Sequence, residues 1–214
     1  MLTPVGTQGQ CKSGYAFATV AAVEASMYKT IKQTVPMSAQ QLVDCSKSTG
    51  NNGCDGGNPV NALHELINKG AMKASDYPYT NRTDTCKYTA AKKFWEIETC
   101  TKADGDIAML KSQILGQPVI VGFDATDMTF IQHGTGLYTP NKCTIKNINH
   151  YMLAVGWGQE TTGTAIKTTH YYIWVKNSFG VQWGDQGYGK VVVQENKSET
   201  GGCGMMTYVF FPYG

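Results

Sequence analysis

The sequence has few charged residues, no long apolar run and no signal-peptide pattern. Charged residues make up 16% of the 214, and 18 Lys plus Arg face 16 Asp plus Glu. A net charge of +2 gives no basic surface for nucleic acid or acidic lipid, so we expect neither as a partner. No apolar stretch is long enough to span a bilayer. The N-terminus lacks a basic and an apolar segment, although a mature or recombinant form would have lost them.

The chain also lacks every common metal-binding cysteine pattern. Its seven cysteines include no Cys-x-x-Cys pair and no zinc-finger spacing with histidine, so we expect neither a metal site nor a cofactor. Cysteines spread along a Gly-rich chain indicate disulfides formed in an oxidising compartment, and an odd number leaves one unpaired. Sequons at Asn81 and Asn196 are compatible with secretion, but sequons are common by chance.

What is present indicates a folded chain whose first half is helical. Hydrophobic residues make up 42%, which is enough for a sizeable core. The stretch 15–29 is apolar on most faces, contains no Gly or Pro, and predicts a buried helix. Ser38 and Gln41 form a capping-box pattern for a short helix that continues through Val43. Further helices are predicted over 60–69, between Asn58–Pro59 and Gly70, and over 106–115.

The second half has the pattern of strands. Short β-branched and aromatic runs alternate with turn residues there. A helical half followed by a strand-rich half predicts an α+β fold with segregated halves, not an alternating α/β sheet. We see no internal repeat and no low-complexity linker. The predicted strands are 118–123, 151–157, 170–175 and 188–193, with one more at 208–211.

Five segments contain residues that can take part in catalysis or substrate binding. They are Gln8-Gly-Gln-Cys-Lys-Ser-Gly-Tyr-Ala-Phe17, Cys54-Asp-Gly-Gly57, Asn149-His150 with the strand end Val155-Gly-Trp-Gly158, Asn177-Ser-Phe-Gly180 and Trp183-Gly-Asp-Gln-Gly-Tyr188. In order and spacing these segments resemble the motifs of the papain family of cysteine peptidases, in particular its cathepsin L-like members. The resemblance runs along nearly the whole chain.

The resemblance implies the fold and the disulfides. We expect one papain-like peptidase domain over 1–214, with a helical left half (about 1–100), a β-barrel-like right half (about 101–207) and an active-site cleft between them. Residues 208–214 would form a C-terminal strand or tail. The match begins about a dozen residues into the usual mature domain, so the propeptide is absent from this sequence. The implied disulfides are Cys11–Cys54, Cys45–Cys86 and Cys143–Cys203, which leave Cys100 over.

The resemblance also implies roles for particular residues. In this family a thiolate at a helix N-terminus attacks a peptide carbonyl, helped by a histidine that an asparagine orients and by an oxyanion-binding glutamine. Gln8 takes the oxyanion role, His150 is the base and Asn177 orients it. The nucleophile position is Gly14, which has no side chain, so the chain is predicted to be inactive. The implied substrate-binding residues are Gly56, Gly57, Pro59, Tyr151 and Trp183.

Other positions around the expected cleft depart from the family pattern as well. Lys12 replaces a glycine, and Tyr15 and Phe179 replace tryptophans. Tyr151 stands where the family has Ala or Gly lining the main specificity pocket, and an aromatic side chain of about 150–250 Å² fills much of such a pocket. Several changes together favour a natural inactive homologue over an engineered knockout, which would normally alter only the nucleophile.

Four functions remain open at this point. The first is a monomeric pseudopeptidase, secreted or lysosomal (or vacuolar), that binds a peptide or protein in the remnant cleft. The second is an inactive, Cys-to-Gly form of a lysosomal or secreted endopeptidase. The third is a structural or storage protein with a blocked cleft. The fourth, hydrolysis through Ser13, is disfavoured because neighbouring side chains at a helix start point in different directions.

Overall fold

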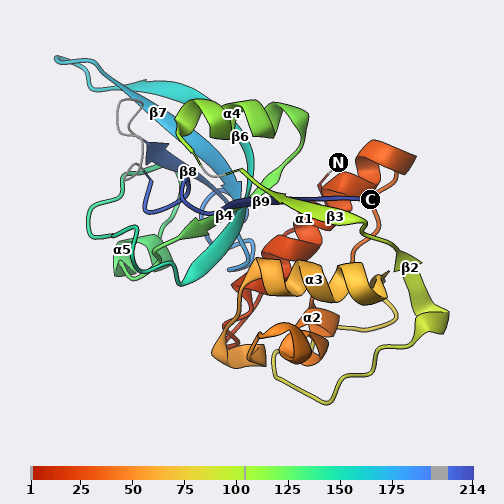
Figure 1. The fold of residues 1–214 in the computed structure, drawn as a ribbon. Helices are drawn as coiled ribbons and strands as arrows, with labels where there is room; N and C mark the ends of the chain where they lie inside the picture. The colour runs from red at the N-terminus through yellow and green to blue at the C-terminus, as the bar shows by residue number, and fades with distance from the viewer. Residues whose placement is uncertain (1, 104, 194–201) are drawn as a thin grey trace. The chain divides into compact units, whose positions relative to one another are not determined.

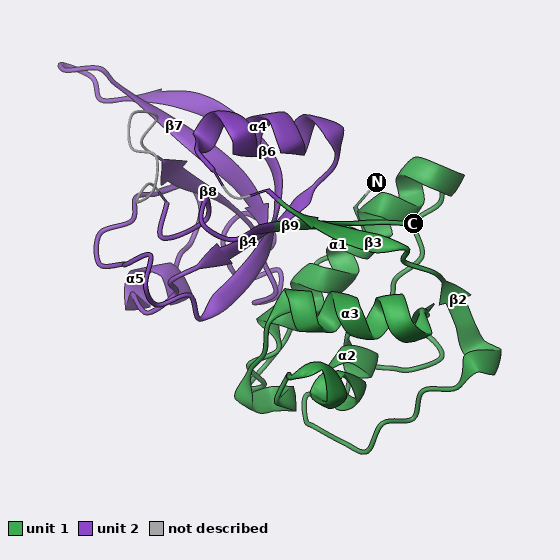
Figure 2. Cartoon of the chain, viewed as in Figure 1, with its two compact units in different colours: residues 1–102, 210–214 green, residues 103–209 purple. Residues whose placement is uncertain are grey.

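The structure is a computed structural model that describes residues 2–103, 105–193 and 202–214 (Figure 1). The chain divides into two compact units. Unit 1 takes in residues 1–102 and 210–214, and unit 2 takes in 103–209 (Figure 2). The sequon at Asn196 lies outside the described residues. No helix in these described ranges is long and apolar enough to cross a membrane.

Helix α1 (Gly14–Ile31) is the central helix of unit 1. Ala16, Val23 and Ala25 are fully buried, and most residues from Gly14 to Met27 are buried with them. The prediction of a buried helix is therefore confirmed, and the real helix is longer by a residue or two at each end. The helix packs against α2 (Ala39–Cys45) and α3 (Pro59–Lys69).

The predicted N-cap residues of α2 and α3 make the expected hydrogen bonds, but the capping box at the start of α2 is not completed. The Ser38 side chain accepts from the Gln41 backbone N–H, and the Asn58 side chain accepts from Val60 N–H. The Gln41 side chain does not complete the capping box. Instead it accepts from Met72 N–H at 2.8 Å and donates to the Gly70 carbonyl at 2.8 Å. A tertiary contact has therefore replaced the local one.

The strand predicted at 208–211 is confirmed as β9, whereas the other short elements of unit 1 were not predicted from the sequence. Strand β3 (Thr99–Lys102) pairs antiparallel with β9 (Val209–Tyr213), from Thr99 opposite Tyr213 to Lys102 opposite Phe210. The end of the chain thus returns to unit 1. The remaining elements are η1 (Ser46–Thr49), η2 (Gly53–Asp55), η3 (Ala90–Lys92), and the antiparallel pair β1 (Ala71–Met72) and β2 (Lys93–Trp95).

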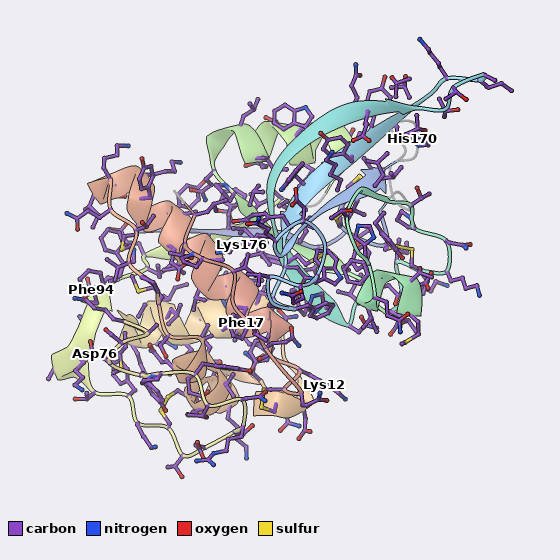
Figure 3. The ribbon with its side chains drawn as sticks, turned by 180° about the vertical axis from the view of Figure 1, so that it is seen from behind. Lys12, Phe17, Asp76, Phe94, His170 and Lys176 are labelled. Atoms are coloured by element: carbon purple, nitrogen blue, oxygen red, sulfur yellow. A yellow bond between two sulfur atoms is a disulfide. The ribbon has the colours of Figure 1, made fainter. Side chains whose placement is uncertain are left out.

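Five strands of unit 2 pair with one another in the order β4-β6-β7-β8-β5. The long hairpin of β6 (His150–Thr162) and β7 (Thr168–Lys176) is its main feature, with His170 on the distal part (Figure 3). Strands β6 and β7 extend beyond their predicted ends because polar Thr and Gln residues continue the pairing. The other elements are α4 (Ile107–Gly116), β4 (Val119–Phe123), α5 (Met128–Ile131), β5 (Leu137–Tyr138) and β8 (Tyr188–Val193).

The sheet of unit 2 is not a closed barrel. The α+β fold class is confirmed, and the half that the resemblance described as barrel-like contains an open sheet. Within the described part of unit 2, β4 and β5 do not pair with each other. Strand β5 has only two residues, Leu137 and Tyr138, paired in parallel with β8, which is too little to close a barrel.

Three disulfides link the pairs of cysteines that the resemblance implied. Cys11–Cys54 and Cys45–Cys86 lie in unit 1, and Cys143–Cys203 lies in unit 2. Cys100 on β3 is a free thiol and is partly buried. Each disulfide joins residues between 41 and 60 positions apart, so all three fix long loops.

Candidate functional site

The residues that the sequence pointed to fall into two groups, one in each unit. The group in unit 1 lies around the start of α1 and the turn before α3. The group in unit 2 lies at the start of β6, after β7 and before β8. The first group is Gln8, Gly14, Gly56, Gly57 and Pro59, and the second is His150, Tyr151, Asn177 and Trp183.

Gly14 is the first residue of α1 and provides no functional group there. Ser13 precedes it as the N-cap residue but makes no side-chain cap hydrogen bond, and the first turn of the helix has no acidic residue. A glycine Cα carries only hydrogens, so nothing at this position can attack a carbonyl. Lys12, two residues earlier, is exposed (Figure 3).

Ser13 is held by a structural hydrogen bond and is 0% exposed. Its Oγ lies 2.7 Å from the hydroxyl of Tyr79, and that hydroxyl donates its single proton to the Gln8 carbonyl at 2.8 Å. Ser13 is then the donor to Tyr79, and its contact with the Cys11 carbonyl is the longer one at 3.5 Å. Burial raises the pKa of Tyr79, while the hydrogen bond from Ser13 lowers it. Ser13 thus joins the loop before α1 to the segment around Tyr79.

The loop that contains Gln8 is fixed from several directions. The Gln8 side chain is buried and donates from Nε2 to the Cys11 carbonyl at 2.9 Å. Cys11 is bonded to Cys54, and Lys12 N–H donates to the Cys54 carbonyl at 3.0 Å. The segment before α1 is therefore cross-linked to the glycine turn.

The turn around Gly56 and Gly57 requires glycine at both positions. Gly56 has φ 117° and ψ 175°, a region that essentially only glycine adopts. A Cβ on Gly57 would lie 2.6 Å from Asn51 Oδ1 and 2.9 Å from Cζ of Tyr15. Asn51 Oδ1 also accepts from the backbone N–H of Asn58 at 2.7 Å, so it cannot move away without cost. Pro59 then begins α3.

In unit 2, His150 and Asn177 form a hydrogen-bonded pair. His150 Nε2 lies 2.8 Å from Asn177 Oδ1, and the Ser178 backbone N–H donates to the same oxygen at 2.8 Å. An amide oxygen only accepts, so Nε2 must carry the proton. The unprotonated nitrogen of the neutral ring is therefore Nδ1, which is the atom that would act as a base.

The surroundings of His150 keep it neutral. The side chain is 5% exposed, stacks on Phe179 with centroids 4.7 Å apart, and has Phe130 at 6.3 Å. Burial lowers the pKa of His150 to about 4, and the hydrogen bond to Asn177 opposes the shift only in part. At neutral pH the ring therefore has no charge.

Trp183 belongs to an aromatic cluster whose centre is Phe130. The indole Nε1 donates to the Phe130 carbonyl at 2.7 Å, and the two rings lie 5.1 Å apart. His133 and Phe179 contact the same indole, at 5.7 and 6.1 Å. Phe179, where the family has tryptophan, thus contacts both His150 and Trp183.

Tyr151 packs against Tyr208, a residue that no sequence motif indicated. The two rings have centroids 5.2 Å apart, and Tyr151 is 9% exposed. Sequence reasoning also missed three other residues that hold the candidate site. They are Asn51, Tyr79 and Phe130; each acts through a contact distant in sequence, which a single sequence gives no signal for.

Two further observations concern alternative chemistry. Burial raises the pKa of the Cys100 thiol, which is the opposite of what an activated nucleophile needs. No group of three or more His, Cys, Asp or Glu side chains that could hold a metal ion occurs among the residues for which the structure gives positions.

The comparison with solved structures places the fold in the class of papain-like cysteine peptidases. Digestive procathepsin L 3 from Tenebrio molitor larval midgut superposes with a TM-score of 0.88 at 33% identity, covering 99% of this chain and 66% of that one. The cysteine protease CMS1MS2 from Carica candamarcensis, solved with E-64, gives 0.86 at 29% identity, covering 99% and 93%.

The chain belongs to the papain family. Residues 1–213 match the family described as papain family cysteine protease. Cathepsin M from Mus musculus is 35% identical over 215 residues, and cysteine proteinase 2 from Entamoeba histolytica is 36% identical over 221 residues. These alignments cover 99% and 100% of this chain but only 62% and 65% of the relatives, so the chain spans less than two thirds of their length.

Proposed function

We propose that this chain is a papain-family pseudopeptidase, which holds an extended peptide or protein segment and does not hydrolyse it. Gly14 carries the proposal. By resemblance it occupies the position of the nucleophile, at the start of α1, and it has no side chain. The family reaction needs a thiolate there, so its first covalent step has no attacking atom.

The side chains nearest to Gly14 in sequence, and the one free thiol, are poor substitutes. Ser13 is fully buried and its hydroxyl is hydrogen-bonded within unit 1, to Tyr79 at 2.7 Å and to the Cys11 carbonyl at 3.5 Å. Cys100 lies on β3, and burial keeps its thiol protonated. His150 is a neutral base in the absence of an anionic partner, which agrees with a lost thiolate–imidazolium pair.

The residues assigned to substrate binding are retained, although the nucleophile is absent. The Gly56–Gly57 turn, Gln8 and Trp183 are each held in place by hydrogen bonds or close packing. A turn without side chains exposes its backbone, and an extended peptide pairs with such a backbone through main-chain hydrogen bonds. Pro59, His150 and Asn177 complete the set that we assign to the remnant site.

The setting of this activity is part of the proposal. Three disulfides and relatives named as cathepsins support a secreted or lysosomal protein. We propose that 1–214 acts as one monomeric domain. A form of an active endopeptidase altered only at its nucleophile is less well supported, because Lys12, Tyr15, Phe179 and Tyr151 differ from the family pattern too.

Hydrolysis is the first test. The unmodified chain and the Gly14→Cys variant are compared on a panel of fluorogenic dipeptide substrates at matched concentration. We expect no turnover by the unmodified chain. Turnover that a serine-directed reagent abolishes would instead assign the reaction to Ser13. Broad activity of Gly14→Cys would favour an endopeptidase altered only at the nucleophile.

Binding is the second test, and it uses a blocked site as its control. Cys100→Ser and the double variant Gly14→Cys/Cys100→Ser are both treated with iodoacetamide, which alkylates only the introduced thiol. Binding of fluorescein-labelled extended peptides is then followed by polarisation. We expect saturable binding by Cys100→Ser and its loss in the alkylated double variant. No binding by either protein would contradict the pseudopeptidase function and favour a structural or storage protein.

A further inference from the structure

Asn81, Arg82 and Thr83 form a sequon on an exposed stretch of unit 1. The first and third side chains of the sequon contact the backbone of one disulfide. Cys11 N–H donates to Asn81 Oδ1 at 3.2 Å. Cys54 N–H donates to Thr83 Oγ1 at 2.8 Å. Because Cys11 and Cys54 are bonded to each other, the folded chain holds the sequon in a defined place beside this disulfide.

The backbone at Asn81 forms a tight turn. Its φ is 57°, in the left-handed region that asparagine enters more readily than most residues. Arg82 has other partners. Its Nε donates to the Asp84 carboxylate at 3.0 and 3.1 Å, and its carbonyl accepts from Gln40 Nε2 at 2.8 Å. The middle side chain of the sequon is therefore engaged with Asp84 and not with the Asn81 amide.

The Asn81 amide has one engaged atom and one free atom. An amide oxygen accepts and an amide nitrogen donates, so the bond from Cys11 N–H fixes which end of the amide faces Cys11. Nδ2 makes no hydrogen bond to any atom in the described ranges 2–103, 105–193 and 202–214. Since Asn81 is exposed, a substituent on Nδ2 replaces water and breaks no hydrogen bond within the protein.

Gly9 leaves the space beside this amide open. A Cβ on Gly9 would lie 2.6 Å from both Oδ1 and Nδ2 of Asn81. Gly9 also has φ 62°, a conformation that favours glycine. A residue with a Cβ would therefore displace the amide that Cys11 N–H holds. With glycine there, no side chain of residue 9 obstructs Nδ2.

We propose that Asn81 is a glycosylation site and carries an N-linked oligosaccharide in the folded protein. Exposed loops with the Asn-x-Ser/Thr pattern are the usual acceptors of this modification. The assignment rests on the secreted or lysosomal setting of the proposed function, because the oligosaccharide donor of this reaction belongs to the secretory pathway. It is independent of peptide binding.

The transfer uses a dolichyl-diphosphate oligosaccharide as the donor. Asn81 Nδ2 forms a bond to C1 of the first sugar, and the bond from C1 to the diphosphate oxygen breaks. Dolichyl diphosphate leaves, and Nδ2 loses one proton. Oδ1 is unchanged by the reaction and keeps its hydrogen bond to Cys11 N–H.

Cell-free translation with endoplasmic-reticulum microsomes tests the modification. The chain is translated behind a cleavable secretion signal, with Asn196→Gln in every version so that the sequon at Asn81 is tested alone. Only the product that added protease cannot digest has entered the microsomes, and only this fraction is scored. We expect a slower-migrating band that an N-glycan amidase converts to the faster one.

Asn81→Asp and Thr83→Ser are the matched variants. Aspartate keeps an oxygen for Cys11 N–H and tolerates left-handed backbone, but it offers no amide nitrogen. Serine keeps the hydroxyl that accepts from Cys54 N–H and that the sequon requires. We expect no glycan on Asn81→Asp and a retained glycan on Thr83→Ser. A protected parent chain without the slower band, or a slower band that persists in Asn81→Asp, would overturn the assignment.

Urea unfolding tests whether the folded chain accommodates the sugar. The secreted glycoprotein is trimmed by an endoglycosidase to a single sugar on Nδ2 and compared with the same chain made in the presence of tunicamycin. We expect the same or a higher midpoint for the sugar-bearing chain, because no hydrogen bond within the protein is lost. A lower midpoint would show that Nδ2 is enclosed in the fold and would overturn the site.

The outcomes separate this site from the proposed function. A glycosylated chain that binds no peptide would contradict the pseudopeptidase function and leave the glycosylation site standing. A chain that binds peptides but receives no glycan in the microsomes would overturn the site alone.

Discussion

The His150 side chain is almost fully buried, and its protonated nitrogen has one polar partner. Asn177 Oδ1 accepts from Nε2, while the stacked Phe179 ring and Phe130 surround the imidazole with apolar surface. Apolar surroundings disfavour the charged ring more than one neutral hydrogen bond favours it. The residue therefore links the stability of the fold to pH.

The pH dependence has a definite sign. Burial lowers the pKa of His150 to about 4 in the folded protein, against about 6.5 in an unfolded chain. Between these values the unfolded chain binds the extra proton, so stability is complete above about pH 6.5 and falls as the pH approaches 4. We expect His150 to account for a loss on the order of 3 kcal/mol between pH 7 and pH 4, measured by urea unfolding.

The comparison variant removes the titrating ring. His150→Gln should show a smaller decrease in unfolding free energy over this range than the unmodified chain. His64→Gln, which changes an exposed histidine on α3, should keep the original dependence. Parallel curves for the unmodified chain and His150→Gln would show that His150 already titrates at its ordinary pKa in the folded state.

At the scale of the local element, the turn from η2 (Gly53–Asp55) into α3 depends on residue size. Asn51 and Tyr15 leave no volume for a side chain on Gly57. The Tyr15 hydroxyl donates to the Gly53 carbonyl at 3.1 Å, so the ring is fixed as well. A tyrosine in place of the family tryptophan therefore still supports this turn.

Gly57→Ala should destabilise the protein by about 1–3 kcal/mol, because overpacking at a fixed site forces its neighbours to shift. Gly116→Ala is a matched control at the end of α4, where a Cβ would meet nothing within 4 Å. That variant should be neutral or slightly stabilising. The free energy of unfolding in urea, measured for both variants, provides the comparison. Equal effects would mean that the turn can relax around a methyl group.

For the whole molecule, three disulfides supplement the cores of the two units. They close loops of 43, 41 and 60 residues. In the chain-entropy account, closing a loop of this size removes about 4 kcal/mol of conformational freedom from the unfolded state. The stability of the chain should therefore depend strongly on the redox state.

Removing Cys143–Cys203 with paired serine substitutions should lower the free energy of unfolding by about 2–5 kcal/mol. Cys100→Ser, which changes a partly buried free thiol, is the control and should have a much smaller effect. Thiol titration of the unmodified native chain should detect Cys100 alone. Detection of further thiols before reduction would contradict the disulfide set.

The sequence by itself determined the features that depend on residues close together in the chain. Helix starts at Ser38 and Asn58, the buried helix α1 and most strands follow from local capping, burial and period-two patterns. The motifs around Gly14, His150 and Asn177 indicated the family, and the absence of a side chain at Gly14 needs no structure to be recognised.

Only the tertiary structure decided the contacts between distant residues. Gln41 turned away from its helix start to bind the backbone of Gly70 and Met72, because a buried polar side chain takes whichever partner the packed fold brings to it. Ser13 proved to be committed to Tyr79, and Tyr151 to Tyr208, 57 positions later. Such pairs form only when separate elements pack, so no local pattern in one sequence encodes them.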